Sequence, residues 1–156
     1  MGNMGAIRSD LHAAYNLGKA IGSGGYSTVY LARLRTQHES NEIGLAVAVK
    51  VFTKSDKTTT QEDVSLLVTS EAGLLLAAQK HPNIIGFHGI FSYVADNDVR
   101  RWTLNLEWCP GGDLHDELTA RGPCSEGQGA EILYGVLSGL AHIHMRNVVH
   151  RDVKAE

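Results

Sequence analysis

Three groups of residues in this sequence have types and spacing suited to phosphate chemistry. The first is a glycine-rich stretch, Gly22–Ser27, in which three positions lack a Cβ. Backbone N–H groups that no Cβ covers can approach a bulky anion closely. The β-branched run 28–31 that follows predicts a strand, and no Gly-Lys-Ser/Thr triplet is present, so neither a dinucleotide-binding turn nor a Walker-type loop is favoured. A plain hairpin turn remains an equally good interpretation of this stretch alone.

The second group is a lysine and a glutamate on apolar faces. In the segment Leu45–Phe52, a period of two places Lys50 on one face with Ala48. Glu71 lies seven residues from Val64, on the apolar stripe of the helix expected next. An unpaired buried charge is severely destabilising, so we expect Lys50 and Glu71 to be buried and to pair. The alternative is that Lys50 extends to solvent and Glu71 lies at the edge of the stripe. The same stripe is expected to contain Leu67, Val68, Leu74, Leu75 and Ala78.

The third group is the segment His150–Glu156. A loop aspartate such as Asp152 can accept a proton from a hydroxyl, and Lys154, two residues later, can meet the negative charge that develops in phosphoryl transfer. On its own, the segment could equally be a solvated cap after a helix.

Periodicity and turn signals predict the elements that position these groups. Capping boxes at 59–62 and 125–128 predict the starts of two helices, the first ending near Gln79. Asp113 is a candidate cap for a short helix near Leu114, and glycines 127, 129, 135 and 139 fall inside the last helix. Strands are predicted at Tyr15–Ile21, Thr28–Leu34, Leu45–Phe52, Ile84–Val94 and Arg101–Glu107. The last helix has apolar residues at helical spacing, namely Ile132, Leu133, Val136, Leu137, Leu140 and Ile143.

Composition limits the class of protein. The 156 residues are 43% apolar and 20% charged, with a net charge of −3, which excludes a disordered chain and disfavours a nucleic-acid binder. No apolar run is long enough to span a bilayer. Two cysteines cannot build a disulfide framework, so an intracellular, cytoplasmic location is expected. His142, His144 and His150 do not have metal-ligand spacing, and we predict no metal ligand in this chain.

In order and spacing, the motifs resemble those of the eukaryotic protein kinase family, from about Tyr15 to Glu156. The resemblance implies an α+β fold: a small lobe at 15–107 with a five-stranded antiparallel sheet and one helix, a hinge at 108–112, and the first helices of a large helical lobe at 113–156. Residues 1–14 would be an N-terminal extension. The motifs are Gly22–Val29, Val47–Lys50, Glu71, His81–Ile84, Leu106–Leu114 and His150–Asp152.

The resemblance also implies a role for each motif. Lys50, held by Glu71, would bind the α- and β-phosphates of ATP. Asp152 would orient and deprotonate a serine or threonine hydroxyl of a protein substrate, and Lys154 would contact the γ-phosphate. The nucleotide would be bound by Ile21, Gly22, Gly24, Gly25, Val29, Ala48, Lys50, Leu106 (as gatekeeper), the backbone of Glu107 and Cys109, and Asp113 near the ribose.

The sequence also departs from the family pattern. Ser27 stands where the third loop glycine is usual, and the Mg²⁺ ligands are expected beyond Glu156. We therefore expect a serine/threonine kinase domain that is partial and inactive as this chain alone. Lys154, two places after Asp152, is similar to the serine/threonine branch, and 152–156 are similar to the calmodulin-dependent and AMP-activated groups. The alternatives are an ATP-binding regulatory module without catalysis, and a hairpin-rich interaction domain whose motifs are incidental.

Overall fold

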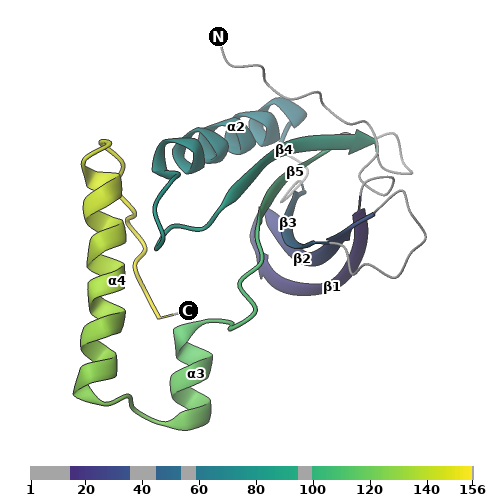
Figure 1. Ribbon diagram of the computed structural model, residues 1–156. Helices are drawn as coiled ribbons and strands as arrows, with labels where there is room; N and C mark the ends of the chain where they lie inside the picture. Colours follow the sequence, from purple (N-terminus) through teal and green to yellow (C-terminus); the bar gives the residue numbers. More distant parts are fainter. Residues whose placement is uncertain (1–14, 36–44, 54–58, 95–99, 156) are drawn as a thin grey trace. The chain divides into compact units, whose positions relative to one another are not determined.

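The computed structural model describes residues 15–35, 45–53, 59–94 and 100–155 (Figure 1). These residues form two compact units. The first contains the described residues up to Gly73 together with Gly86–Trp108, and the second contains Leu74–Ile85 together with the described residues from Cys109 onward. The predicted N-terminal extension, 1–14, lies outside the described residues. The predicted division into lobes at 15–107 and 113–156, joined by a hinge at 108–112, stays a prediction.

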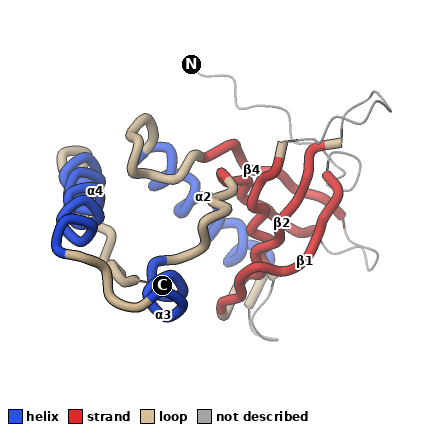
Figure 2. Tube along the Cα trace, turned by 60° about the horizontal axis from the view of Figure 1, so that its bottom comes forward, coloured by secondary structure: helices blue, strands red, loops and turns tan. Residues whose placement is uncertain are grey.

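The first unit contains a five-stranded antiparallel sheet, drawn in red in Figure 2, with strand order β1-β2-β3-β5-β4. The sheet is accompanied by helix α2, so the predicted α+β fold with a five-stranded antiparallel sheet is confirmed. The strands are β1 (Tyr15–Gly24), β2 (Ser27–Leu34), β3 (Ala46–Phe52), β4 (Phe87–Val94) and β5 (Arg100–Glu107).

Strand β3 has different surroundings on its two faces. Val47, Val49 and Val51 point to one face and form a hydrophobic core with Tyr15 and Ala32. Because side chains alternate along a strand, Ala48, Lys50 and Phe52 point to the other face, as the sequence predicts. The valines of β3 therefore pack into the hydrophobic core, and Lys50 lies on the opposite face of the sheet.

Helix α2 is Gln61–Ala78. The predicted capping box has Thr59 as the N-cap residue, so the helix begins one residue later than that box implies. The hydroxyl of Thr60 accepts the N–H of Asp63 at 3.1 Å, and the Asp63 carboxylate accepts the Thr60 N–H at 2.8 Å. The prediction of a box at Thr59–Glu62 was therefore wrong by one position. The buried stripe is also narrower than predicted: Val64, Val68, Ala72 and Ala78 are buried, whereas Leu67 and Leu74 are 42% and 51% exposed.

Strand β4 begins at Phe87, so the prediction of a strand from Ile84 was wrong. The backbone between α2 and β4 makes other hydrogen bonds. Ile84 N–H donates to the carbonyl of His81 at 3.1 Å, and the side-chain amide of Gln79 donates to the carbonyl of Ile85 at 3.1 Å. These hydrogen bonds form a turn, and they occupy backbone N–H and carbonyl groups that would otherwise have to pair with a neighbouring strand.

The second unit contains α3 (Leu114–Arg121) and α4 (Glu126–His144). Asp113 caps α3 by accepting the N–H of Asp116, and Ser125 with Gln128 forms the predicted capping box of α4. The apolar stripe predicted for α4 is largely exposed in the described chain, at Leu133, Val136 and Leu137. The buried residues of α4 are Gly139, His142 and Ile143. None of the described helices has the length and apolar character needed to cross a membrane.

The cap of α2 predicts a pH dependence. Hydrogen bonds from the backbone N–H of Thr60, and secondarily from its hydroxyl, lower the pKa of Asp63 below the ordinary carboxyl value. The folded chain thus binds this proton more weakly than the unfolded chain. The stabilisation is therefore present above the ordinary carboxyl pKa of about 4 and is lost as pH falls through the lowered, folded-state pKa.

We expect Asp63→Ala to lower the thermal midpoint at pH 7, and the difference from the unaltered protein to shrink toward zero in acid. Thr69→Ala is the control, because the Thr69 hydroxyl donates to main-chain carbonyls inside the same helix and involves no carboxylate. Thermal unfolding followed by circular dichroism at a series of pH values measures both. A deficit of Asp63→Ala that stays constant down to strongly acidic pH would contradict the assignment.

Candidate functional site

The glycine-rich stretch forms the tip of the β1–β2 hairpin. Gly24 pairs with Ser27, and the two residues between them form a turn. The turn is tied to the sheet because Thr53 N–H donates to the carbonyl of Tyr26 at 2.9 Å. A Cβ built at Gly24 or at Gly25 would meet no chain atom within 4 Å. The chain's own packing therefore does not require glycine at these two positions, and the absence of side chains leaves their backbone open to a ligand.

The hairpin brings its glycines into register with Lys50. Gly22 pairs with Val29 across β1 and β2, and Val29 pairs with Lys50 across β2 and β3. Residues that pair directly across neighbouring strands share a face of the sheet. The pairing shifts between Ala20 and Gly22, next to the half-buried Ile21, which marks a bulge or irregularity at this point of β1.

Lys50 and Glu71 form the predicted ion pair. The ammonium Nζ of Lys50 lies 2.7 Å and 2.8 Å from the two carboxylate oxygens of Glu71. It also lies 5.1 Å from the ring centroid of Phe52, within the range of a cation–π contact. The side chains of Lys50 and Glu71 are 25% and 35% exposed, so the expectation that both would be buried was wrong. A partly hydrated ammonium is held in place and still accessible to a second anion.

The face that carries Lys50 is apolar toward the start of β3. Ala48 pairs with Leu31 on one side and with Leu106 on the other, and it is 6% exposed. Val29 and Leu106 are half-buried on the same face. The predicted nucleotide-binding residues Val29 and Ala48 and the predicted gatekeeper Leu106 are thus brought together by strand pairing.

Glu107, at the end of β5, is fixed by two hydrogen bonds to one glycine. Its backbone N–H donates to the carbonyl of Gly86 at 2.8 Å, and its carboxylate Oε2 accepts the Gly86 N–H at 2.9 Å. A Cβ at Gly86 would lie 3.1 Å from Oε2, so a larger residue would crowd this contact. Sequence reasoning missed this contact, for which Gly86, directly before β4, was the only signal.

The remaining predicted site residues belong to the second unit. Cys109 is exposed, and the carboxylate of Asp113 caps α3, accepting the N–H of Asp116 at 2.8 Å. The side chains of Asp152 and Lys154 are 75% and 51% exposed, with Lys154 Nζ 3.8 Å from Asp152 Oδ2. Both groups are accessible to a substrate, and their opposite charges lie side by side.

Main-chain contacts shape the segment around Asp152. Arg151 has φ +62, in the left-handed region that favours glycine, and the N–H of Asp152 donates to Nδ1 of His150 at 3.3 Å. The carbonyl of Ala155 accepts the N–H of His115, in the first turn of α3, at 2.9 Å. Sequence reasoning missed this contact, because nothing in the residue types of Ala155 or His115 marks it. Among the described residues, no cluster of three or more His, Cys, Asp or Glu side chains could hold a metal ion.

Comparison with known proteins gives consistent matches. The sequence model of the family described as "Protein kinase domain" matches residues 15–156. Aurora/IPL1-related protein kinase 2 of Caenorhabditis elegans is 32% identical over 142 residues, which cover 91% of this chain and 42% of that protein. Serine/threonine-protein kinase DCLK3 of Mus musculus is 33% identical over 152 residues, 97% of this chain and 17% of that protein. Calcium-dependent protein kinase 12 of Oryza sativa subsp. japonica is 33% identical over 159 residues, 99% of this chain and 27% of that protein. The chain spans less than half the length of these relatives.

The strength of the ion pair can be measured with a double-mutant cycle of Lys50→Met, Glu71→Gln and both together. Because the pair is partly exposed, we expect a coupling free energy of about 1 kcal/mol, the upper end for accessible pairs. Arg121 and Glu117, an exposed pair one helical turn apart in α3, form the control cycle, with an expected coupling of about 0.3 kcal/mol. Denaturant unfolding followed by circular dichroism gives both values. Equal coupling in the two cycles would show that the Lys50–Glu71 contact is an ordinary surface pair.

Proposed function

Because the chain belongs to the protein kinase family, we propose that the protein transfers the γ-phosphoryl group of ATP to a serine or threonine hydroxyl of a protein substrate. The observation that carries this proposal is the Lys50–Glu71 ion pair, on the sheet face shared with Gly22 and Val29. It leaves one accessible ammonium, fixed in direction, on the same sheet as a hairpin tip in which Gly24 and Gly25 lack side chains.

The residues present fit a triphosphate. We infer that Lys50 binds the α- and β-phosphates while Glu71 fixes its position. The ammonium has three hydrogens to donate, and because its side chain is one-quarter exposed a phosphate oxygen can approach it. Backbone N–H groups at Gly22, Gly24 and Gly25 would supply further donors, since a Cβ at the last two positions meets no chain atom.

The adenine end of the nucleotide is assigned to the apolar part of the same face. Ile21, Val29 and Ala48 would contact the ring from the sheet, with Leu106 as gatekeeper, because apolar side chains predominate in ligand pockets. The backbone of Glu107 and Cys109 would hydrogen-bond the adenine edge. The two contacts between Glu107 and Gly86 support this assignment, because they fix the Glu107 backbone in one place.

The chemical step is assigned to the second unit. Asp152 would orient the substrate hydroxyl and accept its proton, and Lys154 would meet the charge on the transferred phosphoryl group. Asp113, besides capping α3, would approach the ribose. Mg²⁺ would neutralise phosphate charge when bound, and we propose that its ligands lie beyond Glu156. On this basis residues 15–156 contribute the ATP-binding residues and the proposed proton acceptor Asp152. A cytoplasmic location remains part of the proposal.

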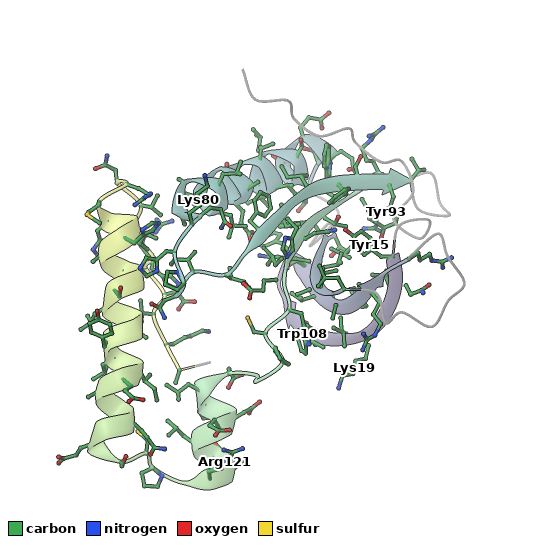
Figure 3. The ribbon with its side chains drawn as sticks, in the orientation of Figure 1. Tyr15, Lys19, Lys80, Tyr93, Trp108 and Arg121 are labelled. Carbon is green, nitrogen blue, oxygen red and sulfur yellow. The ribbon has the colours of Figure 1, made fainter. Side chains whose placement is uncertain are left out.

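Lys50→Met tests the proposed transfer. In the full-length protein that contains these residues, we expect the variant to lose at least about 99% of phosphoryl transfer, because a positioned cation on the phosphates contributes several kcal/mol to transition-state stability. Lys19→Met is the matched control, because Lys19 lies on β1 with its side chain exposed (Figure 3). Incorporation of labelled phosphate into a mixed protein substrate measures both. Near-normal turnover in Lys50→Met would refute the role. ATP binding without transfer in the unaltered full-length protein would favour a regulatory, non-catalytic module instead.

Gly24→Val separates binding from folding. Because a Cβ at Gly24 meets no chain atom, we expect the thermal midpoint without nucleotide to stay close to that of the unaltered chain. The rise in midpoint caused by ATP should be lost, since a branched side chain would cover the backbone at the tip of the hairpin. Gly73→Ala, in helix α2 and also free of contacts, should retain the full ATP effect. An ATP effect that is the same in Gly24→Val as in the unaltered chain would contradict phosphate binding by this stretch.

A further inference from the structure

Ser27, at the end of the glycine-rich stretch, is fixed in the sheet on both sides. It is the first residue of β2, and it pairs with Gly24 of β1 and with Phe52 of β3. Beside this pair, the N–H of Thr53 donates to the carbonyl of Tyr26 at 2.9 Å. Ser27 does not have a positive φ, so its position accepts a side chain without backbone strain. The hydroxyl therefore projects from a fixed point of the sheet.

The Ser27 side chain lies on the face of the sheet that carries Lys50. Residues that pair directly across neighbouring strands share a face, and Ser27 pairs with Phe52, two residues after Lys50 on β3. Side chains two residues apart on one strand also share a face. Ser23 lies on the opposite face, because it pairs with Thr28, the residue after Ser27. The glycine-rich stretch therefore has one serine on each face of the sheet.

The Ser27 hydroxyl has open space on one side and a cation on the other. Ser27 is half-buried, and a Cβ built on Gly24, its partner on β1, would meet no atom within 4 Å. On the β3 side lies Phe52, whose ring centroid is 5.1 Å from Nζ of Lys50. Among the residues that the structure describes, none forms a hydrogen bond with the Ser27 hydroxyl. Ser27 and the ammonium are thus neighbours of the same aromatic residue.

The Lys50 ammonium offers a phosphate only part of its donors. Its Nζ lies 2.7 Å and 2.8 Å from the two carboxylate oxygens of Glu71, and these contacts use two of its three hydrogens. One hydrogen remains for a phosphate group, which presents several acceptor oxygens. A serine hydroxyl donates one hydrogen and rotates to suit its acceptor. Ser27 therefore provides a second side-chain donor on the same face, and hydrogen bonds to charged acceptors are the stronger ones.

We propose that Ser27 is a phosphate-binding residue, whose hydroxyl donates a hydrogen bond to an oxygen of the polyphosphate chain of the nucleotide that Lys50 binds. This inference rests on the proposed function for its ligand and goes beyond it, because the resemblance to the family implies glycine at this position and no side-chain donor. The adenine end is assigned to Val29 and Ala48, further along the strands from the tip. Ser27 therefore contributes to binding of the phosphates and not of the nucleoside.

The test measures the dissociation constants of ADP and adenosine, with Mg²⁺ present, by isothermal titration calorimetry on the full-length protein that contains these residues. Ser27→Ala removes the hydroxyl and keeps the Cβ, whereas Ser27→Thr keeps a hydroxyl on a residue that suits a strand. We expect Ser27→Ala to weaken ADP binding roughly tenfold, because the lost hydrogen bond is to a charged group, and to leave adenosine binding unchanged. Ser27→Thr should bind ADP much as the unaltered protein does.

Ser23→Ala is the matched control, because it removes a hydroxyl from the same stretch on the opposite face of the sheet. It should leave ADP binding unchanged. Equal weakening of ADP and adenosine binding in Ser27→Ala would overturn the proposal, since Ser27 would then support the shape of the site and not contact the phosphates. Unchanged ADP binding in Ser27→Ala would overturn it as well.

The outcome can be separated from that of the proposed function. Weakened ADP binding in Ser27→Ala of a protein that shows no phosphoryl transfer would support the phosphate contact and favour the regulatory, non-catalytic module. Unchanged ADP binding in Ser27→Ala of a protein that transfers phosphate would overturn the role of Ser27 and leave the kinase function standing. Absence of saturable ADP and ATP binding by the unaltered protein would overturn both.

Discussion

The contact between the Lys50 ammonium and the Glu71 carboxylate is the interaction on which the arrangement of the first unit depends. A cation held on an otherwise apolar sheet face is costly unless an anion compensates it. The pair can form only if Lys50 lies on the face of β3 that α2 covers and if Glu71 lies on the side of α2 that faces the sheet. The first condition is met because the valines of β3 pack into the hydrophobic core on the opposite face. Val64, Val68 and Ala72 satisfy the second, because their burial orients α2 so that the neighbouring Glu71 reaches the strand.

Much of this arrangement could be predicted from the sequence, because it depends on local periodicity. Alternation placed Lys50 and Ala48 on one face, and the residue types of Asp113 and Ser125 marked two helix caps, all as observed. The capping box of α2 could not be placed uniquely. Both Thr59 and Thr60 are followed three residues later by an acidic residue, and only the hydrogen bonds of the folded chain select Thr60.

The width of the buried stripe on α2 was misjudged for a similar reason. Leucines occur almost all around this helix, so periodicity leaves its rotation open within a wide arc. The structure selects the small residues Val64, Val68 and Ala72 for the sheet and leaves Leu67 and Leu74 exposed. Contacts made by the main chain, such as Gly86 with Glu107, were beyond prediction because they depend on tertiary position and not on residue type. The kinase subgroup stays a prediction, since the matched relatives include both Aurora-related and calcium-dependent kinases.

Helix α2 belongs to both compact units, with Gln61–Gly73 in the first and its last turn in the second. Its two ends are held by different chemistry. The Asp63 carboxylate and the Thr60 hydroxyl cap its N-terminus, within four residues of sequence. At its C-terminus, Nε2 of His142, 64 residues further along the chain, lies 3.1 Å from the carbonyl oxygen of Ala78. A local cap forms whenever the helix forms, because its partners are already adjacent. A cap from a distant helix forms only when the second unit is folded around it. The N-terminal cap of α2 therefore forms with the helix itself, whereas the contacts at its C-terminal end require the fold of the second unit.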